Sequence, residues 1–205
     1  MKHSMGFSEE DKRRLFDFYN PAIELFGPEE ARSLRWSEKK QQQKRFEALA
    51  AVGKLEGASV LDVGCGFGDL YGFLTGRLTH IDYFGIDINL EMVRVAQEKF
   101  PDASFEVADF GAWRGEPRDY CLASGAFSFK IAKHRDVYLA YIRKLFEYSR
   151  VAAAFNLLDA RYHIDNDTFA AYDPEEIYSF CFGLTEKLYL NDQYLPQDFT
   201  VYLYK

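Results

Sequence analysis

A glycine-rich turn and two aspartates are spaced so that they could hold one ligand. The stretch GCGFG, residues 64–68, follows the apolar segment SVLDV and precedes the helix-like segment DLYGFL. Glycines at every second position let a ligand approach the backbone amides where a strand turns into a helix. Asp87 lies 23 residues after Gly64, close to the spacing of about 20 at which a carboxylate accepts hydrogen bonds from a ribose. Asp109 ends a later strand-like segment, where its carboxylate could accept from an exocyclic amine.

The exact glycine spacing restricts the kind of ligand. A dinucleotide site of the GxGxxG type needs glycine at position 69, and the chain has Asp69 there. A phosphate-binding P-loop is excluded because no Gly-Lys-Ser/Thr sequence follows. Taken alone, GxGxG also fits a tight strand-to-helix turn that uses glycine for its geometry only.

These residues need a sheet whose strands end at one edge. Short apolar segments bounded by turn residues predict strands at 59–64, 83–87, 104–109, 119–124 and 151–158. Most intervals between them can hold a helix, such as the one that Asn89 caps and Pro101 ends. Strands alternating with helices predict an α/β fold with a doubly wound, mostly parallel sheet.

The two ends of the chain depart from this alternation. Residues 8–51 read as helical, and we expect residues 1–51 to form a helical N-terminal cap within the same domain. Residues 52–205 form the expected core, and the segments 184–192 and 198–205 alternate in period two, as the strands of a hairpin do.

Composition limits the partners. The chain has 205 residues, a net charge of −7 and 48% hydrophobic residues, enough for one packed domain. The acidic balance opposes bulk binding to nucleic acid, and no apolar stretch is long enough for a membrane span. The three cysteines are far apart without a CxxC metal spacing, so we expect a cytoplasmic protein with no metal site. The oligomeric state stays open.

VLDVGCGFGDL, FGIDINLEMV and VADF together resemble the first three motifs of the class I S-adenosylmethionine-dependent methyltransferases. The resemblance covers roughly residues 45–160. It implies a Rossmann-like sheet of seven strands, with an antiparallel last strand inserted beside the fifth, which DFTVYLYK could supply. It also implies S-adenosyl-L-methionine as the cofactor.

The resemblance further implies a set of cofactor-binding residues. Its candidates are Asp62, Gly64, Cys65 and Gly66 at the methionine part, Asp87 at the ribose, Ile88 against the adenine, and Asp109 with the Phe110 amide at the adenine edge. Ser124, at the end of the fourth predicted strand, is a further candidate. Cys65 invites comparison with a nucleophile, but no histidine is near it in sequence.

The acceptor is less defined. Methylases that act on the amino groups of nucleic acid bases or glutamine carry an Asn-Pro-Pro-aromatic box where this chain reads Ser124, Gly125, Ala126 and Phe127. We therefore expect a small-molecule acceptor. His163, after the fifth strand, could act as a general base, and an ordinary loop histidine is equally compatible with its position. In the N-terminal cap, Tyr19 could bind the acceptor and Arg45 could pair with the cofactor carboxylate, although packing explains Tyr19 as well.

Two other functions remain open at this level. A protein that binds S-adenosylmethionine without catalysis, as a sensor or partner, would keep the motifs from Gly64 to Asp109 beside a closed acceptor cleft. An aminopropyl transferase uses a similar fold, but no acidic motif for a polyamine follows the fourth strand.

Overall fold

The structure, a computed structural model, describes residues 6–27, 39–163 and 166–205. Its centre is a seven-stranded sheet in the order β3-β2-β1-β4-β5-β7-β6. The strands are β1 (Ser59–Val63), β2 (Asp82–Asp87), β3 (Ser104–Val107), β4 (Arg118–Ala123), β5 (Ser149–Leu158), β6 (Leu188–Leu195) and β7 (Asp198–Tyr204). The helices are α1 (Glu9–Phe26), α2 (Lys39–Ala50), α3 (Asp69–Thr75), α4 (Leu90–Lys99), α5 (His134–Tyr148) and α6 (Pro174–Phe182).

The first five strands are parallel, and β7 runs antiparallel between β5 and β6. The predicted fold class, including the inserted antiparallel strand, is therefore confirmed. The five predicted parallel strands and the hairpin all form, with bounds that differ by a few residues. α6 was not expected, although Asp173 caps its first turn and Pro174 occupies the first helical position.

Two hydrophobic cores cover the two faces of the sheet. On one face, buried side chains of α2, α3 and α4 pack against the strands, among them Leu49, Leu70 and Val93. On the other face, α5 and α6 supply Ile142 and Ile177 to a second core. The sheet therefore has helices on both sides, the arrangement of a doubly wound fold.

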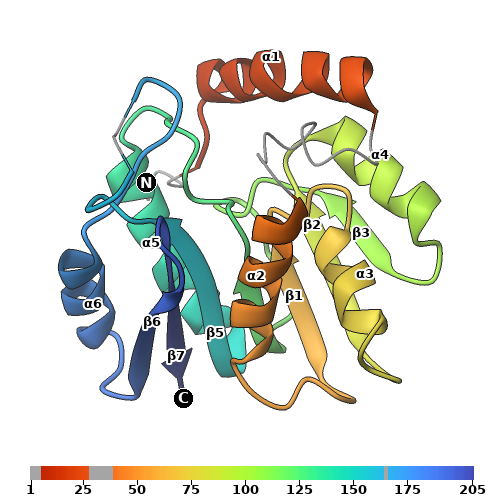
Figure 1. The fold of residues 1–205 in the computed structure, drawn as a ribbon. Helices are drawn as coiled ribbons and strands as arrows, with labels where there is room; N and C mark the ends of the chain where they lie inside the picture. The colour runs from red at the N-terminus through yellow and green to blue at the C-terminus, as the bar shows by residue number, and fades with distance from the viewer. Residues whose placement is uncertain (1–5, 28–38, 164–165) are drawn as a thin grey trace.

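α1 lies across the edge of the sheet at which the parallel strands end (Figure 1). Ser8 and Asp11 form a capping box at its start. The Asp11 carboxylate also accepts from the Ala132 amide at 2.7 Å, and Asn20 accepts from the Asn89 side chain at 2.8 Å. α1 is thus bound to the segment after β4 and to the segment after β2. Within the residues described, no helix is long and apolar enough to cross a membrane.

Candidate functional site

A pocket opens at the carboxyl ends of the strands, where the strand order reverses between β1 and β4. Ligands of open α/β sheets bind at this kind of position. The ends of β1 and β2 and the segments after β3 and β4 line the pocket together with side chains from α1, α2, α3, α4 and α5. Of the twelve candidate site residues from the sequence, ten line it: Tyr19, Asp62, Gly64, Cys65, Gly66, Asp87, Ile88, Asp109, Phe110 and Ser124.

The glycine turn passes close to the segment that follows β4. Gly64 has a φ of +75°, and a Cβ added to it would lie 2.5 Å from the Ala126 side chain. The Gly64 and Cys65 amides both donate to the Ile86 carbonyl, at 2.8 and 3.0 Å. Position 64 therefore needs glycine both for its backbone conformation and for the close approach to Ala126.

Asp62 brings a carboxylate oxygen with no partner to the pocket. Its side chain is buried, and Oδ2 accepts from the Tyr83 hydroxyl at 2.5 Å. Oδ1 is buried with no hydrogen bond among the described residues. Burial raises the pKa of Asp62 to about 7, although the bond from Tyr83 acts in the opposite direction. A buried polar atom without a partner is costly, so Asp62 Oδ1 is suited to meet a cationic or hydrogen-bond-donating ligand group.

Asp87 is held by backbone amides at the end of β2. Oδ2 accepts from Gly66 N at 2.9 Å, and Oδ1 accepts from Asn89 N at 2.9 Å. Burial raises the pKa of Asp87, and these amide bonds oppose the shift. Because a carboxylate oxygen accepts about two hydrogen bonds, each oxygen can still accept from a ligand hydroxyl. The Asn89 side chain caps α4, so Asp87 is not needed for that role.

The Asp109 carboxylate accepts more hydrogen bonds from the protein than the sequence suggested. Its Oδ1 accepts from the Tyr141 hydroxyl at 2.5 Å and from Gly111 N at 2.9 Å. Its Oδ2 accepts from Phe7 N at 3.1 Å. One further bond to Oδ2 is the most that this carboxylate can add toward a ligand. The segment around Phe7 therefore shares Asp109 with whatever binds there.

Apolar side chains complete this side of the pocket. Ile88 and Phe110 line it, and Phe110 is buried. Lys144 Nζ holds the Phe110 turn through the Phe110 carbonyl and, at 2.6 Å, the Trp113 carbonyl. The apolar Ile88 and Phe110 and the polar Asp109 therefore line the same pocket.

Cys65 is buried as a neutral thiol, and Ser124 is bound to a neighbouring side chain. Burial raises the pKa of the Cys65 thiol well above its ordinary value, so its reactive thiolate form is disfavoured. This opposes a nucleophilic role for Cys65 and agrees with its place as a small residue of the loop. The Ser124 hydroxyl donates to the Asn156 side chain at 3.1 Å.

The structure corrects the expectation for Arg45. Its guanidinium is buried against Asp198 of β7, with Nε to Oδ1 at 2.7 Å and Nη2 to Oδ2 at 2.5 Å. Arg45 is absent from the pocket lining, whereas Gln42 and Phe46 of the same helix line it. Positions 42 and 46 are four residues apart and share one helix face, whereas the Arg45 guanidinium turns to Asp198. Gln42 and Phe46 were not predicted from the sequence, although their spacing is that of one helix face.

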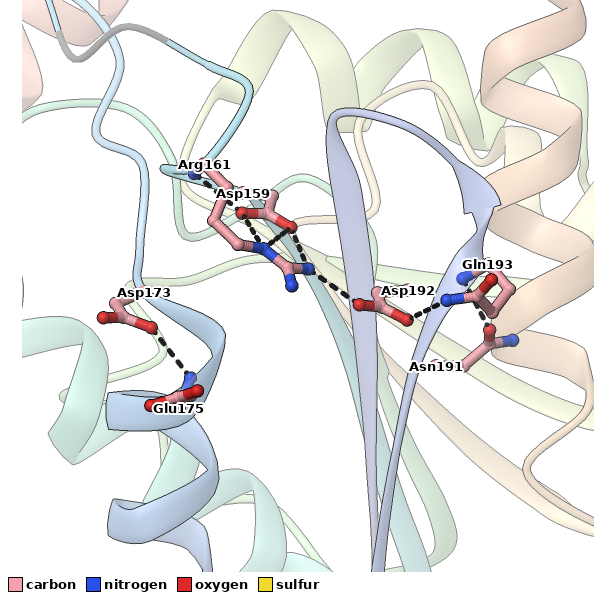
Figure 2. Close-up of polar contacts among 7 residues, drawn as sticks. All are labelled: Asp159, Arg161, Asp173, Glu175, Asn191, Asp192 and Gln193. Carbon is pink, nitrogen blue, oxygen red and sulfur yellow. Dashed lines mark hydrogen bonds and ion pairs between the residues drawn. The ribbon is translucent and has the colours of Figure 1, made fainter.

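His163 also lies outside the pocket lining. The turn that carries it is fixed by Asp159, whose buried carboxylate accepts from the Arg161 amide and guanidinium (Figure 2). Nη2 of Arg161 also donates to the Asp192 carboxylate of β6 at 2.7 Å. His163 N donates to the Asp159 carbonyl at 2.8 Å, and its Nε2 is buried without a hydrogen bond among the described residues. His163 is thus anchored to Asp159 outside the described pocket lining, so the pocket does not gain a histidine base from this turn.

The residues present fit S-adenosylmethionine. The unpartnered Asp62 Oδ1 suits an ammonium, Asp87 suits a ribose, and the space beside Ile88 suits an adenine. No described residues form a group of three or more His, Cys, Asp and Glu that could hold a metal ion.

Known proteins are similar to this chain in sequence and in fold. A family model described as a methyltransferase domain matches residues 60–148. A Mycobacterium tuberculosis protein grouped by name with the methyltransferases, Rv1506c, is 32% identical over 143 residues, 65% of this chain and 84% of that protein. Trans-aconitate 2-methyltransferase from Afipia carboxidovorans is 36% identical over 67 residues, 33% of this chain and 26% of that enzyme.

Among solved structures, magnesium protoporphyrin IX methyltransferase from Synechocystis with bound S-adenosylhomocysteine superposes with a TM-score of 0.69. Its sequence identity is 16%, and the match covers 94% of this chain and 98% of that one. This likeness concerns the fold.

Proposed function

This chain belongs to the class I S-adenosylmethionine-dependent methyltransferases, and we propose that it transfers the methyl group of its cofactor to a small-molecule acceptor. The observation that carries the proposal is the pocket itself. It continues from the ends of β1 and β2 and the segment after β3 to the segment after β4, and Leu15 and Tyr19 of α1 line it as well. α1 lies across this edge of the sheet (Figure 1). A site covered by a helix suits a small molecule better than a polymer.

Several residues are proposed to hold the cofactor. Asp62 Oδ1 would accept from the ammonium of the methionine part, and Asp87 would accept from the ribose hydroxyls. Ile88 would pack on the adenine, and Asp109 Oδ2 would take its exocyclic amine beside the Phe7 amide. Gln42 and Phe46, in place of Arg45, would close the methionine end from α2.

The residues of this chain have a limited chemical task. When bound, S-adenosylmethionine would supply an activated methyl group to an acceptor lone pair, with the sulfonium sulfur leaving as the thioether of S-adenosylhomocysteine. The protein holds the attacking atom of the acceptor about 3 Å from the methyl carbon and excludes water. The glycine turn approaches the segment after β4 so closely that a Cβ added at Gly64 would lie 2.5 Å from the Ala126 side chain. Leu15 and Tyr19 of α1 line the same pocket and would help to exclude water.

Relatives support a small acceptor by their names alone. The trans-aconitate and magnesium protoporphyrin IX methyltransferases both act, by name, on small molecules. These two acceptors differ greatly in size and charge, so the names do not select one of them for this chain.

A screen with methyl-labelled S-adenosylmethionine and a library of small acceptors tests the proposal. We expect label to appear in a small product with wild-type protein and to fall sharply with Asp87→Ala. Asp82→Ala is the matched control, since Asp82 is exposed at the opposite end of β2. Label transferred only to protein or nucleic acid added to the assay would contradict a small-molecule acceptor.

A further inference from the structure

The two halves of the pocket differ in charge. All charged side chains among its described lining residues are carboxylates: Asp62, Asp69, Asp87 and Asp109. These four come from β1, the start of α3, β2 and the end of β3, the half that holds the cofactor in the proposed function. The other half is lined from α1 and from the segment after β4, residues 124–129, without a charged side chain among the described lining residues.

Aromatic rings form the wall of this uncharged half. Phe127 and Phe129 follow β4 and are buried, and both line the pocket. Tyr19 of α1 lines it from above, with its ring centroid 6.0 Å from that of Phe129. Phe18 packs behind them, 5.5 Å from Phe129 and 5.1 Å from Tyr19. Such rings offer flat apolar surfaces to a ligand that also carries a ring.

The wall is held in place by backbone contacts. The Tyr138 hydroxyl donates to the Phe129 carbonyl at 2.6 Å, and the Tyr172 hydroxyl donates to the Phe127 carbonyl at 2.9 Å. On the other side of the cleft, Asp11 binds the Ala132 amide and so fixes α1 above the same segment. A wall that is already ordered loses little conformational freedom when a ligand binds.

From the aromatic wall and the distribution of charge we infer that the acceptor is an uncharged molecule with an aromatic ring, which packs against the wall formed by Tyr19, Phe127 and Phe129. This inference rests on the proposed function, because it assigns the other half of the pocket to the cofactor. A carboxylate in the same place would lose its hydration beside Phe127 and Phe129, and no cationic side chain among the described lining residues could pair with it. Burial of an unpaired ion is strongly unfavourable. A polycarboxylate such as trans-aconitate is therefore not expected to bind.

A matched pair of probes tests the inference. 1-Naphthol and 1-naphthoate share a ring system and differ in charge at neutral pH. Their binding to protein saturated with S-adenosylhomocysteine can be followed by ligand fluorescence. We expect 1-naphthol to bind at least about tenfold more tightly than 1-naphthoate, a difference of about 1.4 kcal/mol.

Three variants locate the binding. Phe129→Ala should lower the affinity for 1-naphthol by about tenfold or more. Tyr19→Arg should lower the affinity for 1-naphthol and raise the affinity for 1-naphthoate. Phe182→Ala removes an exposed ring of α6 and should change neither affinity. Retained affinity for S-adenosylhomocysteine shows that a variant is folded. If Phe129→Ala does not fold, the reversal of preference in Tyr19→Arg still tests the wall.

The outcomes separate the two proposals. Tighter binding of 1-naphthoate or trans-aconitate, or no binding of either naphthalene probe, overturns the inference while S-adenosylhomocysteine binding keeps the proposed function intact. The inference is also overturned if neither Phe129→Ala nor Tyr19→Arg changes the affinity for 1-naphthol. Failure of S-adenosylhomocysteine to bind counts against the proposed cofactor half, and the naphthalene pair then tests the aromatic wall without it.

Discussion

At the scale of single residues, Asp87 has the most specific arrangement in the site. Two backbone amides orient its carboxylate, one from Gly66 to Oδ2 and one from Asn89 to Oδ1. A side chain held in this way is positioned before a ligand arrives, which favours directional hydrogen bonds to a pair of hydroxyls.

Asp87→Ala should weaken binding of S-adenosylhomocysteine by about 1.5–3 kcal/mol, the range for a hydrogen bond to a charged group. Titration calorimetry measures the change. Asp82→Ala, at the exposed beginning of the same strand, should leave the affinity unaltered. An unchanged affinity in folded Asp87→Ala protein would remove Asp87 from the site.

Asp62 should make stability depend on pH. Its pKa is raised by burial from 3.8 to about 7, so the folded protein retains a proton that the unfolded chain releases between these values. The contribution of Asp62 to the free energy of unfolding is therefore complete below pH 3.8 and is lost as the pH rises to about 7. Thermal unfolding of wild type and Asp62→Asn across this interval measures the effect. The variant should show the smaller loss of melting temperature, and parallel curves would contradict the assignment.

His163 should not control the rate of transfer. Its backbone amide is bound to the Asp159 carbonyl, and His163 is not among the described residues that line the pocket. A general base contributes roughly 10²–10⁴-fold, whereas His163→Ala is expected to change the rate only slightly and equally at all pH values. Turnover measured against pH, once an acceptor is known, decides the matter. A large loss that shrinks at high pH would instead make His163 the base.

Some of these residues could be placed at the site from the sequence, and others could not. Motifs at strand ends placed Asp62, Asp87 and Asp109 around one pocket, because parallel strands bring their carboxyl ends to a common edge. Arg45 was misplaced because the rotational position of α2 depends on its packing against β7, where Asp198 pairs with it. His163 lies on a turn whose direction is set by contacts with β6, distant in sequence.

At the scale of elements, α1 determines whether the pocket is covered. It is bound near its start through Asp11 to Ala132, and farther along through Asn20 to Asn89. These two contacts span both halves of the strand-end edge. The cover therefore connects the segment after β4 with the segment after β2.

Asp11→Ala should loosen this cover. The substitution removes the capping partner of Ser8 and leaves the Ala132 amide without its acceptor, at a cost of roughly 1–3 kcal/mol. We expect faster proteolysis within α1 and weaker binding of S-adenosylhomocysteine. Glu10→Ala, an exposed acid in the same first turn, is the control. Equal proteolysis of both variants would show that Asp11 does not fasten the helix.

The sequence predicted the sheet more completely than the cover. The segments that form β1 to β5 are short, largely apolar and bounded by turn residues, and the hairpin of β6 and β7 shows alternation, so local pattern was sufficient. The pocket-facing Phe7, Leu15 and Phe129 were missed, since only the docking of α1 brings them together. α6 was missed because its signal is a short Asp-Pro start before nine helical residues.

At the scale of the whole molecule, charge and topology agree on the type of ligand. The net charge is −7, and four carboxylates line the pocket. A sulfonium cofactor with an ammonium group is attracted to such a site, whereas a dinucleotide pyrophosphate would be repelled by it. The replacement of a third glycine by Asp69 points in the same direction.

Titration calorimetry of the wild-type protein with S-adenosylmethionine, repeated in the presence of excess NAD, tests the central claim most directly. The pocket should bind one S-adenosylmethionine per chain, S-adenosylhomocysteine should compete for it, and NAD should leave the affinity unchanged. Binding of NAD in the absence of any binding by S-adenosylmethionine would contradict the methyl-donor site assigned to the ends of β1, β2 and β3.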